Sequence, residues 1–133
     1  MKKIFVRFTI KGDELDINQL SQDVCVNADT YVKGWIYPHK FNGNPKPQKT
    51  NRWVYSLESE STENVNDILS RLFVNLSPFL EKINVYTKKF YAVTDIVVYA
   101  DETSSTVNLN LSKKSIAILH GLNSKISFSV IDF

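Results

Sequence analysis

Apolar and polar residues alternate along several stretches of the chain, and this period of two is typical of half-buried β-strands. The clearest run is residues 4–10, in which every second side chain is large and apolar before Gly12 ends the pattern. The same alternation marks residues 53–57 and 126–131. Residues 90–100 are rich in β-branched and aromatic side chains and predict a long central strand.

Two weaker patterns predict further strands. Residues 30–37 read as a strand that Pro38 ends. Residues 101–105 supply a hairpin loop, after which Val107, Leu109 and Leu111 alternate with asparagines to form the second arm.

Helical spacing is strongest between Ser61 and Ser77. Either Ser61 or Thr62 is expected to cap this helix, and Ser77 before Pro78 is expected to restart it as a kinked or two-part helix that runs to about Ile83. The apolar side chains of the first part recur three and four residues apart and predict one buried face: Val65, Ile68, Leu69, Leu72, Phe73 and Leu76.

Two shorter helices are marked by their caps. Asp16 with Gln19 fits a capping box, which predicts a first helix to about Asp23. Ser112 is expected to cap a third helix over residues 113–120, which Gly121 would close in a left-handed conformation.

The predicted order is β-α-β-loop-β-α-β-β-α-β, which indicates an α+β fold. A mostly antiparallel sheet of about six strands would carry its helices on one face. At 133 residues the chain is expected to form a single domain over residues 1–133, with a long exposed loop at about 36–52.

This loop is the main candidate for function. Residues 35–52 contain three of the four prolines and no acid, and long loops without secondary structure are usually functional or disordered. Its aromatic and basic side chains are the candidate partner-binding residues: Trp35, Tyr37, Lys40, Phe41, Lys46 and Lys49. An acidic set near the first helix is the alternative docking surface: Asp13, Glu14, Asp16 and Asp23.

The residues indicate no enzyme. His39 and His120 are far apart in the sequence, and the single cysteine, Cys25, is flanked by valines and is expected in the core. No cofactor is expected, and helix capping and solvation account for the acidic set better than a metal site does. Basic and aromatic residues in the loop would also suit single-stranded nucleic acid, but the net charge is only +2.

Nothing in the sequence predicts a membrane segment. The apolar runs are shorter than the roughly 20 residues that a membrane helix needs, and the start of the chain lacks the apolar core of a signal peptide. One cysteine allows no internal disulfide, so the expected location is the cytoplasm.

The order and spacing of short motifs resemble the bacterial domain of unknown function 4279 family. A Gly-acidic-Leu-Asp helix start follows the first strand at residues 10–16, and a Lys-Gly pair follows at 33–34. A lone tryptophan strand spans 52–56, and a final strand-helix-strand unit runs from 109 through 122. The resemblance covers nearly the whole chain and implies a fold without an established activity.

These observations favour a non-catalytic protein-binding module. Small single domains without chemistry of their own include bacterial immunity proteins, which occlude the active site of a cognate toxin, and this function is the one expected here. That expectation rests on analogy. The alternative is a small-molecule or nucleic-acid-binding domain, or an enzyme, with its site between the sheet and the 35–52 loop.

Overall fold

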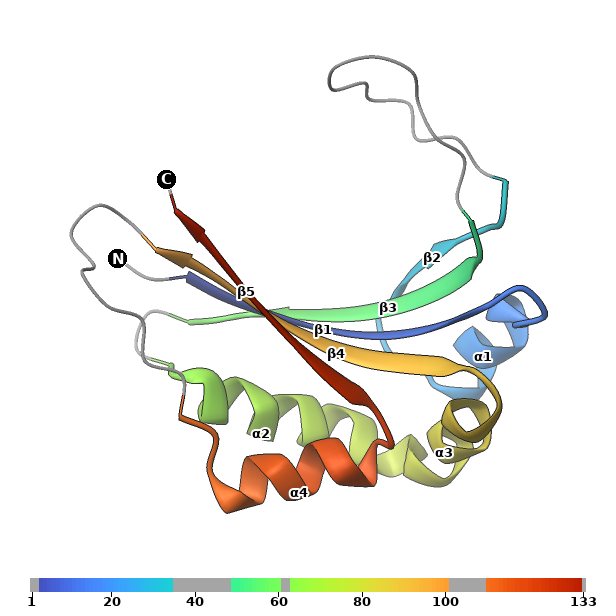
Figure 1. Ribbon diagram of the computed structural model, residues 1–133. Coiled ribbons are helices and arrows are strands. Elements are labelled where there is room, and N and C mark those ends of the chain that lie inside the picture. Colours follow the sequence, from blue (N-terminus) through green and yellow to red (C-terminus); the bar gives the residue numbers. More distant parts are fainter. Residues whose placement is uncertain (1–2, 35–48, 61–62, 101–109, 133) are drawn as a thin grey trace, which may run out of the picture.

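The computed structural model describes residues 3–34, 49–60, 63–100 and 110–132, which form one sheet with helices on one face (Figure 1). This arrangement confirms the predicted α+β class. In chain order the elements are β1 (Lys3–Gly12), α1 (Ile17–Asp23), β2 (Asp29–Tyr31), β3 (Asn51–Glu58), α2 (Val65–Leu76), the 3-10 helix η1 (Ser77–Phe79), α3 (Leu80–Lys89), β4 (Tyr91–Ala100), α4 (Lys113–Gly121) and β5 (Lys125–Asp132).

The described part of the sheet has five strands in the order β2-β3-β1-β4-β5. Four of them pair antiparallel, whereas β5 runs parallel to β4 because α4 crosses over between the two. The predicted sixth strand is not among them. Asn110 and Leu111 lie in a loop, and the rest of that arm falls outside the described residues.

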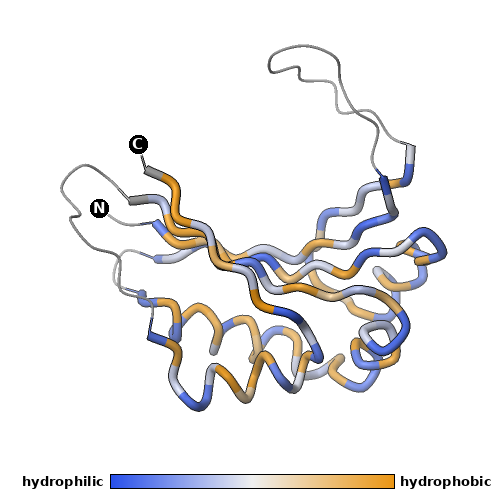
Figure 2. The backbone as a smooth tube through the Cα atoms, in the orientation of Figure 1, coloured by the Kyte–Doolittle hydropathy of each residue, from blue (hydrophilic) through white to orange (hydrophobic). Residues whose placement is uncertain are grey.

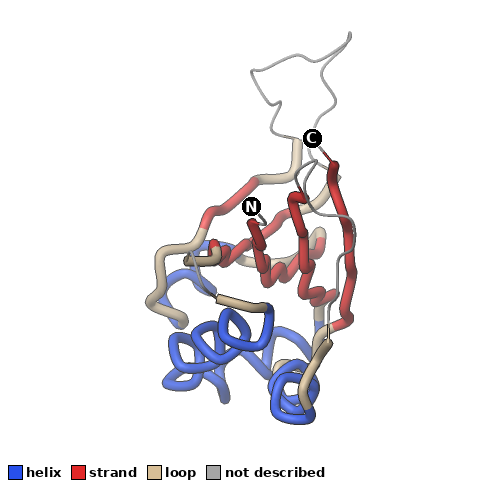
Figure 3. The backbone as a smooth tube through the Cα atoms, turned by 90° about the vertical axis from the view of Figure 1, so that its left-hand side faces the viewer, coloured by secondary structure: helices blue, strands red, loops and turns tan. Residues whose placement is uncertain are grey.

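The helices and the sheet form two layers, seen edge-on in Figure 3. Apolar side chains of β1, β3 and β4 point towards the helices, as the alternation predicts. Figure 2 shows orange, hydrophobic segments along the strands and along the helices below them. Trp53 is fully buried there and meets the ring of Phe8 edge-on, with 6.2 Å between the ring centroids. The half-buried strand that the alternation over residues 53–57 predicts is therefore confirmed.

Two strand boundaries differ from the prediction. β2 ends at Tyr31, and Gly34 follows in a turn with a φ of 86°, so the predicted strand over 30–37 is too long. β3 begins at Asn51 and not at Trp53, because the Asn51 side chain binds the Lys33 N–H and the carbonyls of Asp13 and Leu15. The final residues of the expected loop therefore belong to the sheet.

The helix ends also differ in detail. Asn64, and not Ser61 or Thr62, caps α2 through a reciprocal capping box with Asp67. The chain restarts at Ser77 as expected, but α3 continues to Lys89 and not to Ile83. After α4 the left-handed residue is Asn123, with a φ of 53°, and not Gly121.

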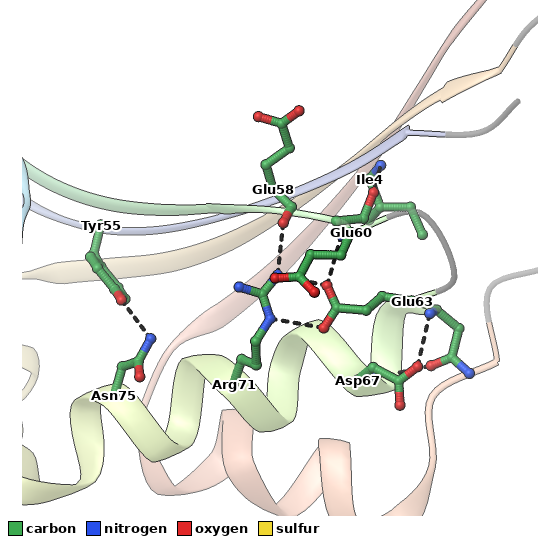
Figure 4. Close-up of polar contacts among 10 residues, drawn as sticks. Ile4, Tyr55, Glu58, Glu60, Glu63, Asp67, Arg71 and Asn75 are labelled. Atoms are coloured by element: carbon green, nitrogen blue, oxygen red, sulfur yellow. Dashed lines mark hydrogen bonds and ion pairs between the residues drawn. The ribbon is translucent and has the colours of Figure 1, made fainter.

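A polar network fastens the start of α2 to the end of β3 (Figure 4). Arg71 donates to both carboxylate oxygens of Glu63 at 2.7 and 2.8 Å and to the backbone carbonyl of Glu58 at 2.7 Å. Further along α2, the Asn75 amide donates to the Tyr55 hydroxyl at 2.8 Å. These contacts hold α2 under the sheet in a fixed orientation.

Candidate functional site

Most of the predicted loop site lies outside the residues that the structure describes. Trp35, Tyr37, Lys40, Phe41 and Lys46 lie outside the described residues, and so does His39. Lys49 is described and its side chain is exposed, two residues before β3 begins. The candidate residues of the loop therefore stay a prediction.

The acidic set is described, and three of its four members have structural partners. Asp13 pairs with Lys33 at 3.4 Å, and Asp16 caps α1 by accepting the Gln19 N–H. Asp23 accepts a 2.7 Å hydrogen bond from the Tyr86 hydroxyl, which lowers the pKa of the Asp23 carboxyl. Glu14 is exposed. These contacts give Asp13, Asp16 and Asp23 structural roles around α1, and Glu14 is the member of the set without one among the described residues.

The hydrogen bond between Tyr86 and Asp23 also affects the pKa of its donor, the Tyr86 hydroxyl. Burial, followed by the Asp23 carboxylate, raises the pKa of Tyr86 to about 12. Tyr86 therefore stays protonated at neutral pH and ties α3 to the end of α1.

Cys25 is exposed, so its expected place in the core is wrong. The flanking Val24 is fully buried, and because alternate residues of an extended segment point to opposite sides, Cys25 faces out. His120 lies in the last turn of α4 as expected, with its side chain exposed. Among the described residues, no three histidine, cysteine or acidic side chains gather closely enough to hold a metal ion.

The strongest candidate site lies on the sheet face that the helices leave open. The register places Tyr31, Arg52, Lys11 and Tyr91 directly beside one another on β2, β3, β1 and β4. Lys125 continues this line on β5, where it sits opposite Val93. We call these five residues the cation–tyrosine row. Four strand spacings give the row a length of about 19 Å.

Cations and rings contact one another along the row. The Lys11 and Lys125 ammonium groups lie 4.9 and 5.1 Å from the centroid of the Tyr91 ring, and the Arg52 guanidinium lies 5.7 Å from that of Tyr31. Such contacts orient cations without neutralising them. Within the described ranges none of these three cations makes an ion pair, so the row presents net positive charge.

Two buried polar groups, one in the row and one beside it, have no hydrogen-bond partner among the described residues. The Thr9 hydroxyl and the Arg52 Nε atom are buried, and neither finds a hydrogen-bond partner in the described part of the chain. Thr9 is 1% exposed and lies one register step from Lys11 and Arg52 on the same face. Buried polar groups are normally satisfied, so this part of the sheet is more polar than its packing requires.

The opposite end of the open face has a different character. Lys3 forms an ion pair with Glu58, and the rings of Phe5 and Tyr99 meet edge-on at 5.3 Å. At that end Lys3 is therefore neutralised, whereas Arg7 lies 6.0 Å from the centroid of the Phe5 ring and makes no ion pair among the described residues. The row differs from that end because it gathers three such cations in one line.

A model of the domain of unknown function DUF4279 matches residues 2–133, essentially the entire chain. The chain belongs to the DUF4279 family. The expected resemblance is thereby confirmed. The family is one of unknown function, so membership assigns no activity. No curated protein and no solved structure matches the chain.

A functional proposal for this DUF4279 domain therefore rests on its geometry. Sequence reasoning missed Lys11, Arg52, Tyr91 and Lys125 because each is a solvated position of its own strand and they are far apart in the sequence. The available signal was that these residues occupy the outward phase of the strand patterns.

Among the described helices, none has both the length and the apolar character needed to cross a bilayer.

Proposed function

We propose that this protein is a non-catalytic binding module that docks an acidic partner protein on the open face of its sheet. The observation that carries the proposal is the cation–tyrosine row, in which three cations and two tyrosines occupy one line on the sheet face that the described helices leave uncovered. Tyrosine and arginine are enriched among residues that dominate binding energy at protein interfaces. Cations that lack ion pairs favour a partner with carboxylates at matching positions.

The charge of the molecule favours a protein over a nucleic acid. The net charge is +2, and Asp29, Glu58 and Asp95 share the open face with the row. A phosphate backbone would be repelled by these acids, whereas a protein can match a mixed pattern of charges. The tyrosine rings would still suit single-stranded nucleic acid, so an oligonucleotide belongs in the test.

Within this class, the proposed role is that of a cytoplasmic immunity protein that blocks the active site of a cognate toxin. The support is by analogy: a small domain of 133 residues with a candidate docking surface and no proposed chemistry of its own. The 35–52 loop would extend the docking surface, since it leads directly into Arg52. Lys40, Lys46 and Lys49 would then add charge of the same sign as the row.

The test is co-purification with the product of the adjacent gene, followed by titration of the pair at low and high salt. Lys11 and Arg52 are both changed to Glu. The matched control changes Lys113 and Lys114, two exposed residues on the helix side, to Glu as well. We expect the row variant to lose affinity by about 100-fold, because close charge pairs at interfaces couple by about 1.5 kcal/mol or more each. The control should change it by less than about threefold.

Three outcomes would contradict the proposal. Equal losses in the row variant and the control would show that only net charge matters. Loss only when Asp13, Glu14 and Asp16 become Lys would move docking to the acidic set. Tight binding of a labelled single-stranded oligonucleotide, abolished by the row variant, would replace the protein partner with nucleic acid.

A further inference from the structure

An open cavity of about 370 Å³ lies at the end of the sheet where β4 and β5 begin. Its lining includes Phe90, Tyr91, His120, Ser124 and Lys125, which come from the start of these strands and the end of α4. Cavities for small ligands start at about 300 Å³ and combine apolar walls with a few polar groups. This cavity has both properties.

Contacts between separate elements hold its walls. The Phe90 ring lies directly over the backbone of β1, since a Cβ atom added to Gly12 would be 2.5 Å from Phe90 Cδ1. The Asn123 side chain donates to the Thr87 carbonyl at 3.2 Å and so joins the turn after α4 to α3. The hydroxyls of Ser124 and Thr94 are hydrogen-bonded at 2.9 Å. The cavity is therefore preformed.

Its charge is positive. Lys125 contributes an ammonium group, and none of the described residues that line the cavity carries a carboxylate. The Tyr91 ring has two ammonium groups near it, those of Lys11 and Lys125, each about 5 Å from its centroid. Two like charges around one ring repel each other, and an anion bound beside them would relieve that repulsion.

We propose that this cavity binds a small aromatic anion, a planar ring that carries a phosphate or carboxylate group. The ring packs on Phe90 and Tyr91, and the anionic group accepts hydrogen bonds from the Lys125 ammonium at the mouth. A lysine ammonium has three donors, so those that do not point at the Tyr91 ring remain available for the ligand. This site goes beyond the proposed docking of a protein and does not rest on it.

The probes are phenyl phosphate and benzoate, each titrated into the ¹⁵N-labelled full chain while backbone amide shifts are recorded by NMR. Inorganic phosphate lacks the ring and benzyl alcohol lacks the charge, so they serve as ligand controls. We expect saturable shifts at residues 90–92 and 121–125 with the two aromatic anions. Both controls should bind at least about tenfold more weakly, a loss of about 1.4 kcal/mol.

Lys125→Gln should weaken the binding of phenyl phosphate by about tenfold, because a charge-assisted hydrogen bond is lost. Lys113→Gln removes an exposed lysine on α4, outside the cavity lining, and should leave the affinity unchanged. Phenyl phosphate binding is measured without a protein partner, and protein docking is measured without phenyl phosphate. The two proposals can thus fail separately.

Inorganic phosphate binding as tightly as phenyl phosphate would overturn the aromatic part of the proposal. Benzyl alcohol binding equally well would overturn the anionic part. The absence of saturable shifts with either aromatic anion would overturn the site itself.

Discussion

Residues that are adjacent in the sequence lie on opposite faces of the sheet and have different surroundings there. On β3, Trp53 points to the helices and is fully buried, whereas Arg52 points to the open face and lies over the Tyr31 ring. The helix side is apolar and closely packed, so a side chain there must have a size that fits the core. The row on the open side is constrained by charge and register. A substitution of a buried residue on the helix side should therefore cost stability, and one in the row should cost binding.

The largest expected effect tests this division directly. Trp53→Ala should lower the free energy of unfolding by about 3–5 kcal/mol, because it opens a cavity beside Phe8 in the centre of the core. The measurement is chemical denaturation followed by circular dichroism. Arg52→Ala is the matched control from the next position and should change the value by less than about 1 kcal/mol. Similar costs for the two variants would abolish the distinction between the faces.

Gly12 ends β1 beside the Phe90 ring, and its substitution should have the second largest effect. Gly12→Ala should cost about 1–3 kcal/mol, because the new Cβ would lie 2.5 Å from Phe90 Cδ1 and the ring would have to move. Gly121→Ala is the control, since no atom lies within 4 Å of the Cβ that it adds. It should be neutral or slightly stabilising in thermal unfolding. A harmless Gly12→Ala would mean that Phe90 is free to shift.

The helix-covered face was largely predictable from sequence, and the open face was not. Burial imposes alternation on each strand, so the inward phase of residues 4–10 and 53–57 could be recognised locally. The cation–tyrosine row depends on register between strands that are distant in the sequence. No local pattern indicates that Lys11 lies between Arg52 and Tyr91.

The errors in local structure have a similar origin. The cap of α2 is Asn64 because its side chain and that of Asp67 satisfy each other's backbone, and the nearby Ser61 and Thr62 offered equivalent sequence signals. Cys25 was expected inside because its neighbours are valines, but the extended backbone turns alternate residues outward. In each case several residues fitted the same local rule, and tertiary contacts selected one.

Two buried threonines give a finer comparison of the faces. Thr94 lies on the helix side and shares a 2.9 Å hydrogen bond with Ser124, whereas the hydroxyl of Thr9 on the open face has no partner in the described ranges. Thr94→Val should cost about 1 kcal/mol, because a hydrogen bond is lost. Thr9→Val keeps the shape and removes an unpaired hydroxyl, so it should be neutral or stabilise by about 1 kcal/mol.

Thermal unfolding of both valine variants would measure this difference. If Thr9→Val proves as costly as Thr94→Val, the Thr9 hydroxyl has a partner in solution, and the open face is better satisfied than its contacts indicate.

The smallest expected effect concerns the polar contacts that fasten the helix side. Hydrogen bonds from Arg71, and then from the Glu60 N–H, lower the pKa of the Glu63 carboxyl. Because the folded-state pKa is depressed, the ion pair stabilises the fold above the unfolded pKa of about 4.3, and this contribution is lost as the pH falls through the lower folded value. For a pair near the surface it should amount to less than about 1 kcal/mol.

Urea denaturation between about pH 6 and pH 2.5 should therefore show a shallower loss of stability for Glu63→Gln than for the parent chain. Glu14→Gln removes an exposed carboxylate elsewhere and should leave the slope unchanged. If Glu63→Gln follows the parent curve at every pH, the link from Arg71 to Glu63 does not hold α2 against β3, and the Arg71 contact with the Glu58 carbonyl must do so alone.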